Sequence, residues 1–164
     1  MESVNSVRHI VLELMSTFDE FVNNLESAAG KFDEPVLLEI SHDPKGARAK
    51  MEAMAGREGL MIFSRLDHGQ LLKLYGIETK AFVYGIGNPL IAGSMTRTNP
   101  AAGLYAPVRV MVYQEKGKPV TVEYDEPSSF FGQFGSEIGA VGLALDKKLY
   151  DLILAADLGN TDFC

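Results

Sequence analysis

The amino-acid sequence predicts a single α/β domain. Segments whose apolar residues recur every three or four positions, as on one face of a helix, alternate with short runs of β-branched and aromatic residues, which favour strands. The chain has 164 residues, of which 46% are hydrophobic and 23% charged, which is the size and composition of one globular domain with a continuous core. No internal repeat or low-complexity tract divides it.

The N-terminal segment is predicted to form an amphipathic helix over residues 4–25. Its apolar residues are spaced alternately by three and four and keep a heptad period. They are Val4, Val7, Val11, Leu14, Phe18, Phe21 and Leu25. Such a stripe must cover an apolar surface, which is either the domain's own sheet or the helix of a second copy. Residues 1–30 are therefore predicted to be an N-terminal extension of a domain that comprises residues 31–164.

Local signals define the two elements that follow. The apolar run at residues 35–40 predicts a strand that begins with Pro35, where a missing N–H is tolerated. Asp43 is a favourable N-cap, and Pro44 suits the first position of a helix. We therefore expect a helix over residues 44–55.

Four further apolar runs predict the remaining strands. They lie at residues 60–63, 81–84, 108–113 and 120–124. The last two are joined by a glycine-containing connection of hairpin length, which predicts that they pair antiparallel.

The C-terminal part of the chain begins with a segment rich in glycine and phenylalanine, at residues 128–142. Glycine lowers order whereas buried aromatic rings need cover, so the segment is either a mobile flap or a close-packed irregular region. Apolar residues from 145 to 156 return to helical spacing, and Gly159 lies just beyond them, which predicts a final amphipathic helix.

Charge and cysteine content exclude several classes of function. With 22 acidic against 15 basic residues and a net charge of −7, the chain lacks the basic surface that nucleic acids require. Cys164 is the only cysteine, so the chain can form neither an internal disulfide nor a cysteine-based metal cluster. The first residues show neither a signal peptide nor a membrane span. We therefore expect a soluble cytoplasmic protein with no nucleic-acid or membrane partner.

Three motifs together resemble the domain-of-unknown-function family DUF302. Leu66-Asp67-His68 follows one predicted strand, and Gly87-Asn88-Pro89 follows the next. The segment PAAGLYAP at residues 100–107 then leads directly into the strand VRVMVY. The order and spacing of these motifs match the family, and the resemblance covers roughly residues 36–153.

The resemblance implies a two-layer α/β (α+β) sandwich. Its element order would be β-α-β-β-β-β-α, similar to the TATA-box-binding-protein class, with helices on one face of an antiparallel sheet. This chain departs from the short form of the family by its N-terminal helix and by the segment 128–142. The fold class itself carries no function.

Asp67 and His68 are the residues best suited to acid–base chemistry. A carboxylate and an imidazole just after a strand could transfer protons or bind a ligand. Neighbouring side chains of an extended chain point in opposite directions, which argues against a cooperative pair. The alternative is structural: Asp67 caps a short helix over residues 69–75, and His68 packs at the strand end.

Gly87 and Asn88 belong to a turn that could hold an anion. The turn follows a strand and opens a helix, so backbone N–H groups and the helix dipole could bind a phosphate or carboxylate. A tight turn with Asn88 as N-cap and Pro89 at the first helical position explains the same residues without a ligand. Arg109 lies in an otherwise apolar strand, and strand alternation favours the solvent face over a pocket shared with Asp67.

Three functions remain open. The leading hypothesis is a homodimeric small-molecule binding or sensing module for a small, anionic ligand. Its cleft would combine the Asp67-His68 turn, the Asn88-Pro89 turn and the segment 128–142. The second is an interaction module that docks through the heptad helix, and the third is a small enzyme with His68 as general acid or base. The three histidines lack metal-ligand spacing and no nucleotide motif is present, so no metal or cofactor is expected.

Overall fold

The computed structural model describes residues 2 and 4–160, and Cys164 lies outside this part of the chain. Six strands form one sheet in the order β1-β6-β5-β4-β3-β2, in which every neighbouring pair is antiparallel except the parallel pair β2 and β3. The strands are β1 (His9–Glu13), β2 (Gly30–Lys31), β3 (Met61–Asp67), β4 (Lys80–Gly87), β5 (Val108–Gln114) and β6 (Thr121–Asp125).

The structure has seven α-helices within the described residues. They are α1 (Phe18–Ala28), α2 (Val36–Glu39), α3 (Pro44–Met54), α4 (His68–Leu72), α5 (Pro89–Thr96), α6 (Pro127–Phe131) and α7 (Ser136–Asp157). Short 3₁₀ turns lie at Arg57–Gly59, Lys73–Tyr75, Pro100–Tyr105 and Gly132–Phe134.

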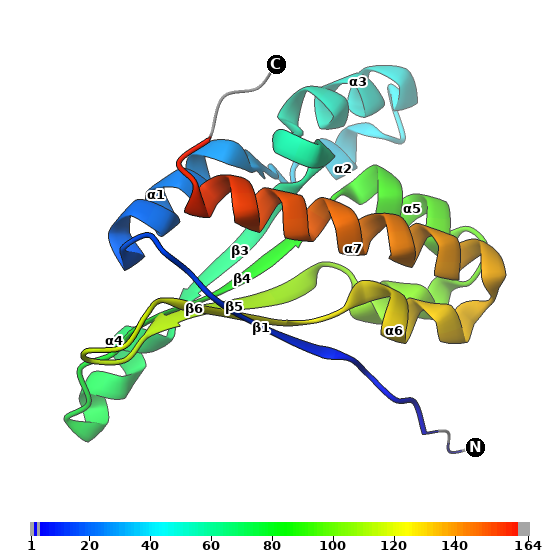
Figure 1. Cartoon of the computed structure of the whole chain (residues 1–164). Coiled ribbons are helices and arrows are strands. Elements are labelled where there is room, and N and C mark those ends of the chain that lie inside the picture. Colours follow the sequence, from blue (N-terminus) through cyan, green and yellow to red (C-terminus); the bar gives the residue numbers. More distant parts are fainter. Residues whose placement is uncertain (1, 3, 161–164) are drawn as a thin grey trace.

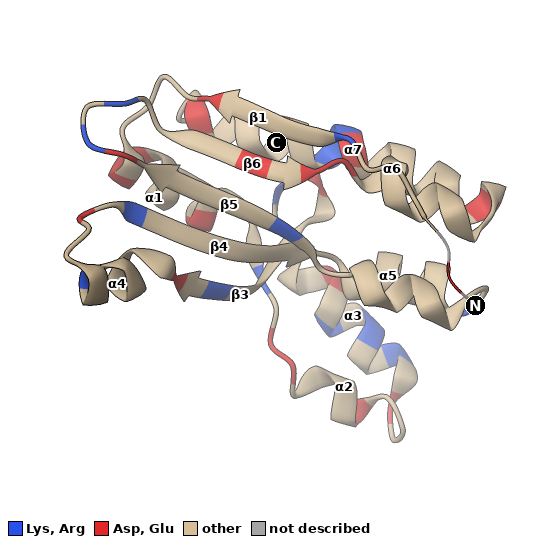
Figure 2. Cartoon of the chain, turned by 90° about the horizontal axis from the view of Figure 1, so that it is seen from below, with Lys and Arg blue, Asp and Glu red and all other residues tan. Residues whose placement is uncertain are grey.

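Helices α1 and α7 cover one face of this sheet and leave the other largely open, while α4 lies beyond one end of the strands (Figure 1). The long helix α7 runs across the sheet beside α1, and the view from below shows the strands in front of these helices (Figure 2). Within the described residues, no helix combines the length and the apolar character that a bilayer crossing needs.

The core lies between the sheet and the helices α1 and α7. Alternation along the central strands sends Val110, Val112 and Tyr84 inward, where their side chains are fully buried. Phe21 of α1 and Leu152 of α7, also fully buried, belong to the same cluster. The two-layer α/β sandwich that the sequence predicts is therefore confirmed.

The helix predicted over residues 4–25 is wrong in its first half. Residues His9–Glu13 form the edge strand β1, and pairing with β6 sends Ile10 and Leu12 toward the core. The helix α1 begins only after Thr17, whose hydroxyl accepts a hydrogen bond from the Glu20 N–H at 3.3 Å. Of the predicted stripe, Leu14, Phe18, Phe21 and Leu25 are buried, whereas Val4, Val7 and Val11 are exposed.

The strand predicted at residues 35–40 is also wrong, because this run forms the short helix α2. Its Val36 is buried against Ala47 and Met51 of α3, in a small apolar cluster apart from the main core. A short apolar run does not by itself distinguish a strand from a buried helix turn, and here the helix packing prevails.

The remaining predicted elements are confirmed. Helix α3 begins after Asp43, whose carboxylate accepts a hydrogen bond from the Gly46 N–H at 2.9 Å. Strands β3 to β6 lie where the sequence predicts them, and β5 and β6 pair antiparallel. The element order is richer than β-α-β-β-β-β-α, because β1, α1 and β2 precede α2 and further short helices follow β3, β4 and β6.

The segment 128–142 is closely packed, as one of the two expectations has it, but it is helical rather than irregular. It comprises most of α6, a 3₁₀ turn and the start of α7, so the final helix is longer than predicted. At Gly142 a Cβ atom would lie only 2.9 Å from the Cα of Ser128, which shows how tightly α7 crosses α6. Gly142 therefore allows the two helices to pack closely, and the segment 128–142 does not form a mobile flap.

Two alanine substitutions test the corrected N-terminal structure. Phe21→Ala should lower the free energy of unfolding by about 3–5 kcal/mol, because it removes a fully buried ring. Val4→Ala should change it by less than about 0.5 kcal/mol, because Val4 is 95% exposed. Urea denaturation followed by circular dichroism measures both values. A comparable loss in Val4→Ala would instead support a continuous packed helix from residue 4.

Candidate functional site

The candidate site is a cavity of about 640 Å³ on the open face of the sheet. Its floor is formed by outward-facing residues of β3, β4 and β5, and its wall by the end of the 3₁₀ turn Pro100–Tyr105 and by Phe130 of α6. The lining residues are Val7, Ser64, Leu66, Val83, Tyr84, Gly85, Leu104, Tyr105, Ala106, Pro107, Val108, Arg109, Asp125 and Phe130. Cavities of this size commonly hold small molecules.

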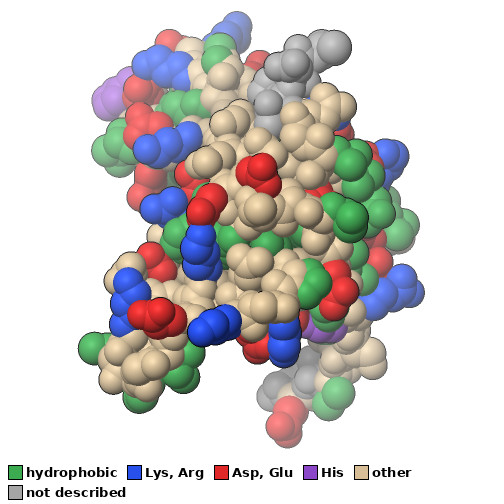
Figure 3. All heavy atoms as spheres, turned by 60° about the vertical axis from the view of Figure 1, so that its left-hand side comes forward, with side chains coloured by type: hydrophobic (Ala, Val, Ile, Leu, Met, Phe, Trp, Pro, Cys, Tyr) green, Lys and Arg blue, Asp and Glu red, His purple; other side chains and the backbone are tan. Residues whose placement is uncertain are grey.

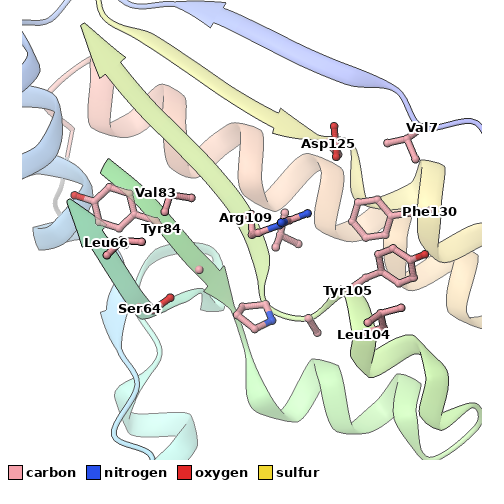
Figure 4. A pocket seen from close by; sticks show the side chains of 14 residues that line it. Val7, Ser64, Leu66, Val83, Tyr84, Leu104, Tyr105, Arg109, Asp125 and Phe130 are labelled. Carbon is pink, nitrogen blue, oxygen red and sulfur yellow. The ribbon is translucent and has the colours of Figure 1, made fainter. Parts of the chain in front are cut away.

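Arg109 supplies the positive charge of this cavity. It lies between the buried residues Val108 and Val110, so alternation turns its side chain to the open face, as the sequence predicts. Figure 4 shows its side chain extending from β5 into the cavity, on the side of Phe130. Within the described residues Arg109 makes no hydrogen bond or ion pair, and it is the only basic residue of the lining.

The other charged surface residues near the sheet are mostly paired. Arg65 donates to the Glu26 carboxylate at 2.9 Å, and Lys80 lies 2.7 Å from an Asp19 carboxylate oxygen. On the side of the molecule at α1 and α4, basic and acidic side chains lie interspersed rather than gathered by sign (Figure 3). Arg109, by contrast, has a guanidinium that is available to an anion.

Aromatic rings form one wall of the cavity. The rings of Tyr105 and Phe130 stack with their centroids 5.1 Å apart, and Phe134 contacts Tyr105 at 5.8 Å. The sequence-based site did not include Tyr105 or Phe130. The sequence did hint at both residues. Tyr105 lies in the motif PAAGLYAP, and Phe130 belongs to the aromatic residues of the segment 128–142, which need other side chains to cover them.

Gly85 lets the side chains of Ser64 and Pro107 lie close to the backbone of β4 at the floor of the cavity. A Cβ atom there would lie 2.8 Å from the Ser64 Oγ and 3.0 Å from the Pro107 Cγ. Pro107 also lies near Gly87, where an added Cβ would meet the Pro107 Cβ at 3.5 Å. The proline ring, which follows a cis peptide bond, therefore covers both glycines at the edge of the cavity.

The acidic residue of the cavity, Asp125, is engaged by a histidine. His9 Nδ1 lies 2.9 Å from Asp125 Oδ1, and His9 Nε2 lies 3.0 Å from Glu123 Oε2. The hydrogen bonds to Asp125 and then to Glu123 raise the pKa of His9 above its ordinary value of 6.5. The bond from the Tyr113 hydroxyl, followed by that from His9, lowers the pKa of Glu123. Asp125 and Glu123 therefore share His9 as a hydrogen-bond partner.

Asp67 and His68 do not belong to this cavity. The Asp67 carboxylate caps α4 by accepting a hydrogen bond from the Gln70 N–H at 2.9 Å, which confirms its structural interpretation. Asp67 pairs with Phe82 on β4, whereas Gly87 lies five residues further along that strand and pairs with Met61. At about 3.4 Å per residue, the two turns are at opposite ends of the sheet. The cleft predicted from both turns and the segment 128–142 is therefore wrong.

Gly87 and Asn88 form the predicted turn, but the side chain of Asn88 already satisfies it. Its Oδ1 accepts from the N–H groups of Leu90 and Ile91, at 2.8 and 3.2 Å, and its Nδ2 donates to the Gly59 carbonyl at 2.7 Å. The N-cap with Pro89 at the first helical position is confirmed. This leaves the start of α5 without the free N–H groups that an anion would need, so the anion site predicted here is not supported.

Comparisons with known proteins agree with this fold. The family model described as "Domain of unknown function DUF302" matches residues 38–156, which include the strands β3 to β6. A solved structure, the uncharacterized conserved protein DUF302 from Bacillus stearothermophilus, is similar with a TM-score of 0.64 and 16% sequence identity, over 90% of this chain and 97% of that chain. No curated protein matches the sequence significantly. Since the family model spans most of the chain and covers the floor of the cavity, this chain belongs to the DUF302 family.

Proposed function

We propose that this protein binds or senses a small molecule that carries an anionic group, in the cavity on the open face of the sheet. The observation that carries the proposal is the guanidinium of Arg109, with which no described residue pairs, in a cavity whose other lining residues are mostly apolar. A carboxylate or phosphate could accept paired hydrogen bonds from this planar group. The stacked rings of Tyr105 and Phe130 would shield those bonds from water.

Binding explains the lining better than catalysis does. Ser64 is the lining residue best suited to act as a nucleophile, and among the described residues its hydroxyl has no histidine or carboxylate as hydrogen-bond partner. The acidic residue, Asp125, is held by His9. One cation, aromatic walls and apolar residues are what recognition of an anion with an apolar body requires.

The Arg109→Gln variant tests the proposal. Isothermal titration with benzoate and phenyl phosphate should show binding to the wild type and a roughly 10- to 100-fold weaker affinity for the variant, since a charged hydrogen-bond donor is lost. Arg48→Gln is the matched control, because Arg48 lies on α3 in an exposed pair with Glu52. Equal affinities of the wild type and Arg109→Gln, or no binding of either anion, would reject Arg109 as the anchor.

We also propose that the protein forms a homodimer through the free edge of β1. The N–H of Leu14 donates to the Val120 carbonyl at 2.8 Å, and that of Glu126 to the Arg8 carbonyl at 2.8 Å. Every second residue of an antiparallel edge strand bonds to its neighbour, so the backbone groups of His9, Val11 and Glu13 point away from the sheet. An open edge of this kind can pair with another strand.

The second copy is favoured as the partner because β1 is self-complementary. In an antiparallel pairing centred on Val11, His9 of each chain lies opposite Glu13 of the other, so an imidazole faces a carboxylate twice. The exposed side chains Val7, Val11 and Met15 lie along the same edge and would lose contact with water. The proposed dimer surface therefore includes Val7 and Val11 of the apolar stripe predicted from the sequence, but Val11 lies on the strand β1 and Val7 just before it, rather than on a helix.

Val11→Pro tests the dimer. Two hydrogen bonds across the two-fold axis would be lost, which should raise the dimer dissociation constant roughly 30-fold. The control is Val11→Thr, which keeps the N–H and the β-branched shape. Native mass spectrometry over a concentration series reports the assembly of all three proteins. A monomeric wild type, or a Val11→Pro dimer as tight as that of Val11→Thr, would contradict pairing through β1.

A further inference from the structure

A second cavity, of about 320 Å³, adjoins the first where β4 ends and β5 begins. Ala106, Pro107 and Val108 line both cavities, and Arg109 is the next residue of the chain. The ring of Pro107, which covers Gly85 and Gly87, therefore lies at the boundary between them. A molecule bound to Arg109 would enter the second cavity by extending past Pro107 at this shared end of the sheet.

The walls of this second cavity are almost entirely apolar. They include Phe32, Phe63, Ile91, Met95, Phe131 and Leu145. Among its described lining residues none is charged, and the side chain of Asn88 is already hydrogen-bonded on both its oxygen and its nitrogen. A polar group placed here would lose its hydrogen bonds to water without replacement, whereas a hydrocarbon would lose nothing.

The size of the second cavity sets the length of hydrocarbon that it accepts. If one methylene occupies about the 30 Å³ that a water molecule takes in the liquid, there is room for on the order of ten carbon atoms. The stacked rings Phe32 and Phe63, with centroids 4.3 Å apart, form one side of this space. A short anion held by Arg109 would leave it unfilled.

We infer that the ligand is a single-chain amphiphile, with a carboxylate on Arg109 and an unbranched alkyl chain of about eight to ten carbons in the second cavity. The inference rests on the proposed function and adds the class of ligand. The anionic head matches the one unpaired cation of the described lining, and the tail matches the second cavity, whose described lining has no charged residue and is mostly apolar.

The test is a chain-length series. Isothermal titration with acetate, hexanoate, octanoate and decanoate, all below their micellar concentrations, should give affinities that rise about threefold to fourfold with each added methylene. Ala92→Phe, on α5 in the wall of the second cavity, should abolish this rise while benzoate still binds as it does to the wild type. Ala53→Phe on α3, an exposed position, should leave the whole series unchanged. Decanol, which lacks the charge, should bind the wild type and Arg109→Gln equally.

The outcomes separate the inference from the proposed function. Arg109-dependent binding of benzoate with no dependence on chain length would overturn the amphiphile and leave the anion site standing. A chain-length dependence that persists in Ala92→Phe would place the tail elsewhere and also overturn it. The absence of binding by every carboxylate would remove both. If circular dichroism shows that Ala92→Phe does not fold, Thr96→Leu fills the same wall with a smaller change.

Discussion

The packing of α1 and α7 against one face of the sheet is the constraint on which the rest of the structure depends. Because the helices bury only that face, the central strands send apolar side chains inward at alternate positions, as Val110 and Val112 do. The positions between them are released from this requirement. They can carry Arg109, Glu123 and His9, so these three polar side chains share the open face of the sheet.

The parts of the fold that depend on neighbouring residues could be predicted from the sequence. The caps at Asp43, Asp67 and Asn88 are local, since each side chain bonds to N–H groups two or three residues ahead. Arg109 was placed correctly by alternation alone. The N-terminal helix failed because the spacing of Val4, Val7 and Val11 fits a heptad only by coincidence. The alternation of the apolar residues Ile10, Leu12 and Leu14 instead suits a strand, and pairing with β6 stabilises this strand.

The candidate site could be predicted only in part, because it is assembled from distant segments. Asp67 and Gly87 each end a strand, but antiparallel pairing of β3 with β4 places those two strand ends at opposite ends of the sheet. Tyr105 and Phe130 are far apart along the chain and meet only when α6 folds back over the start of β5. No local pattern states that two aromatic residues will stack, so the wall of the cavity required the three-dimensional structure.

The position of β1 also has a consequence for how the molecule is made. Its residues His9–Glu13 pair with Thr121–Asp125, across about 110 residues of chain, while β3, β4 and β5 pair with near neighbours. In a polypeptide made from its N-terminus, β1 leaves the ribosome well before its partner β6 and must wait for it. During that interval its apolar residues Ile10 and Leu12 have no sheet to join. This edge of the sheet therefore forms late in folding, because it closes a loop of about 110 residues.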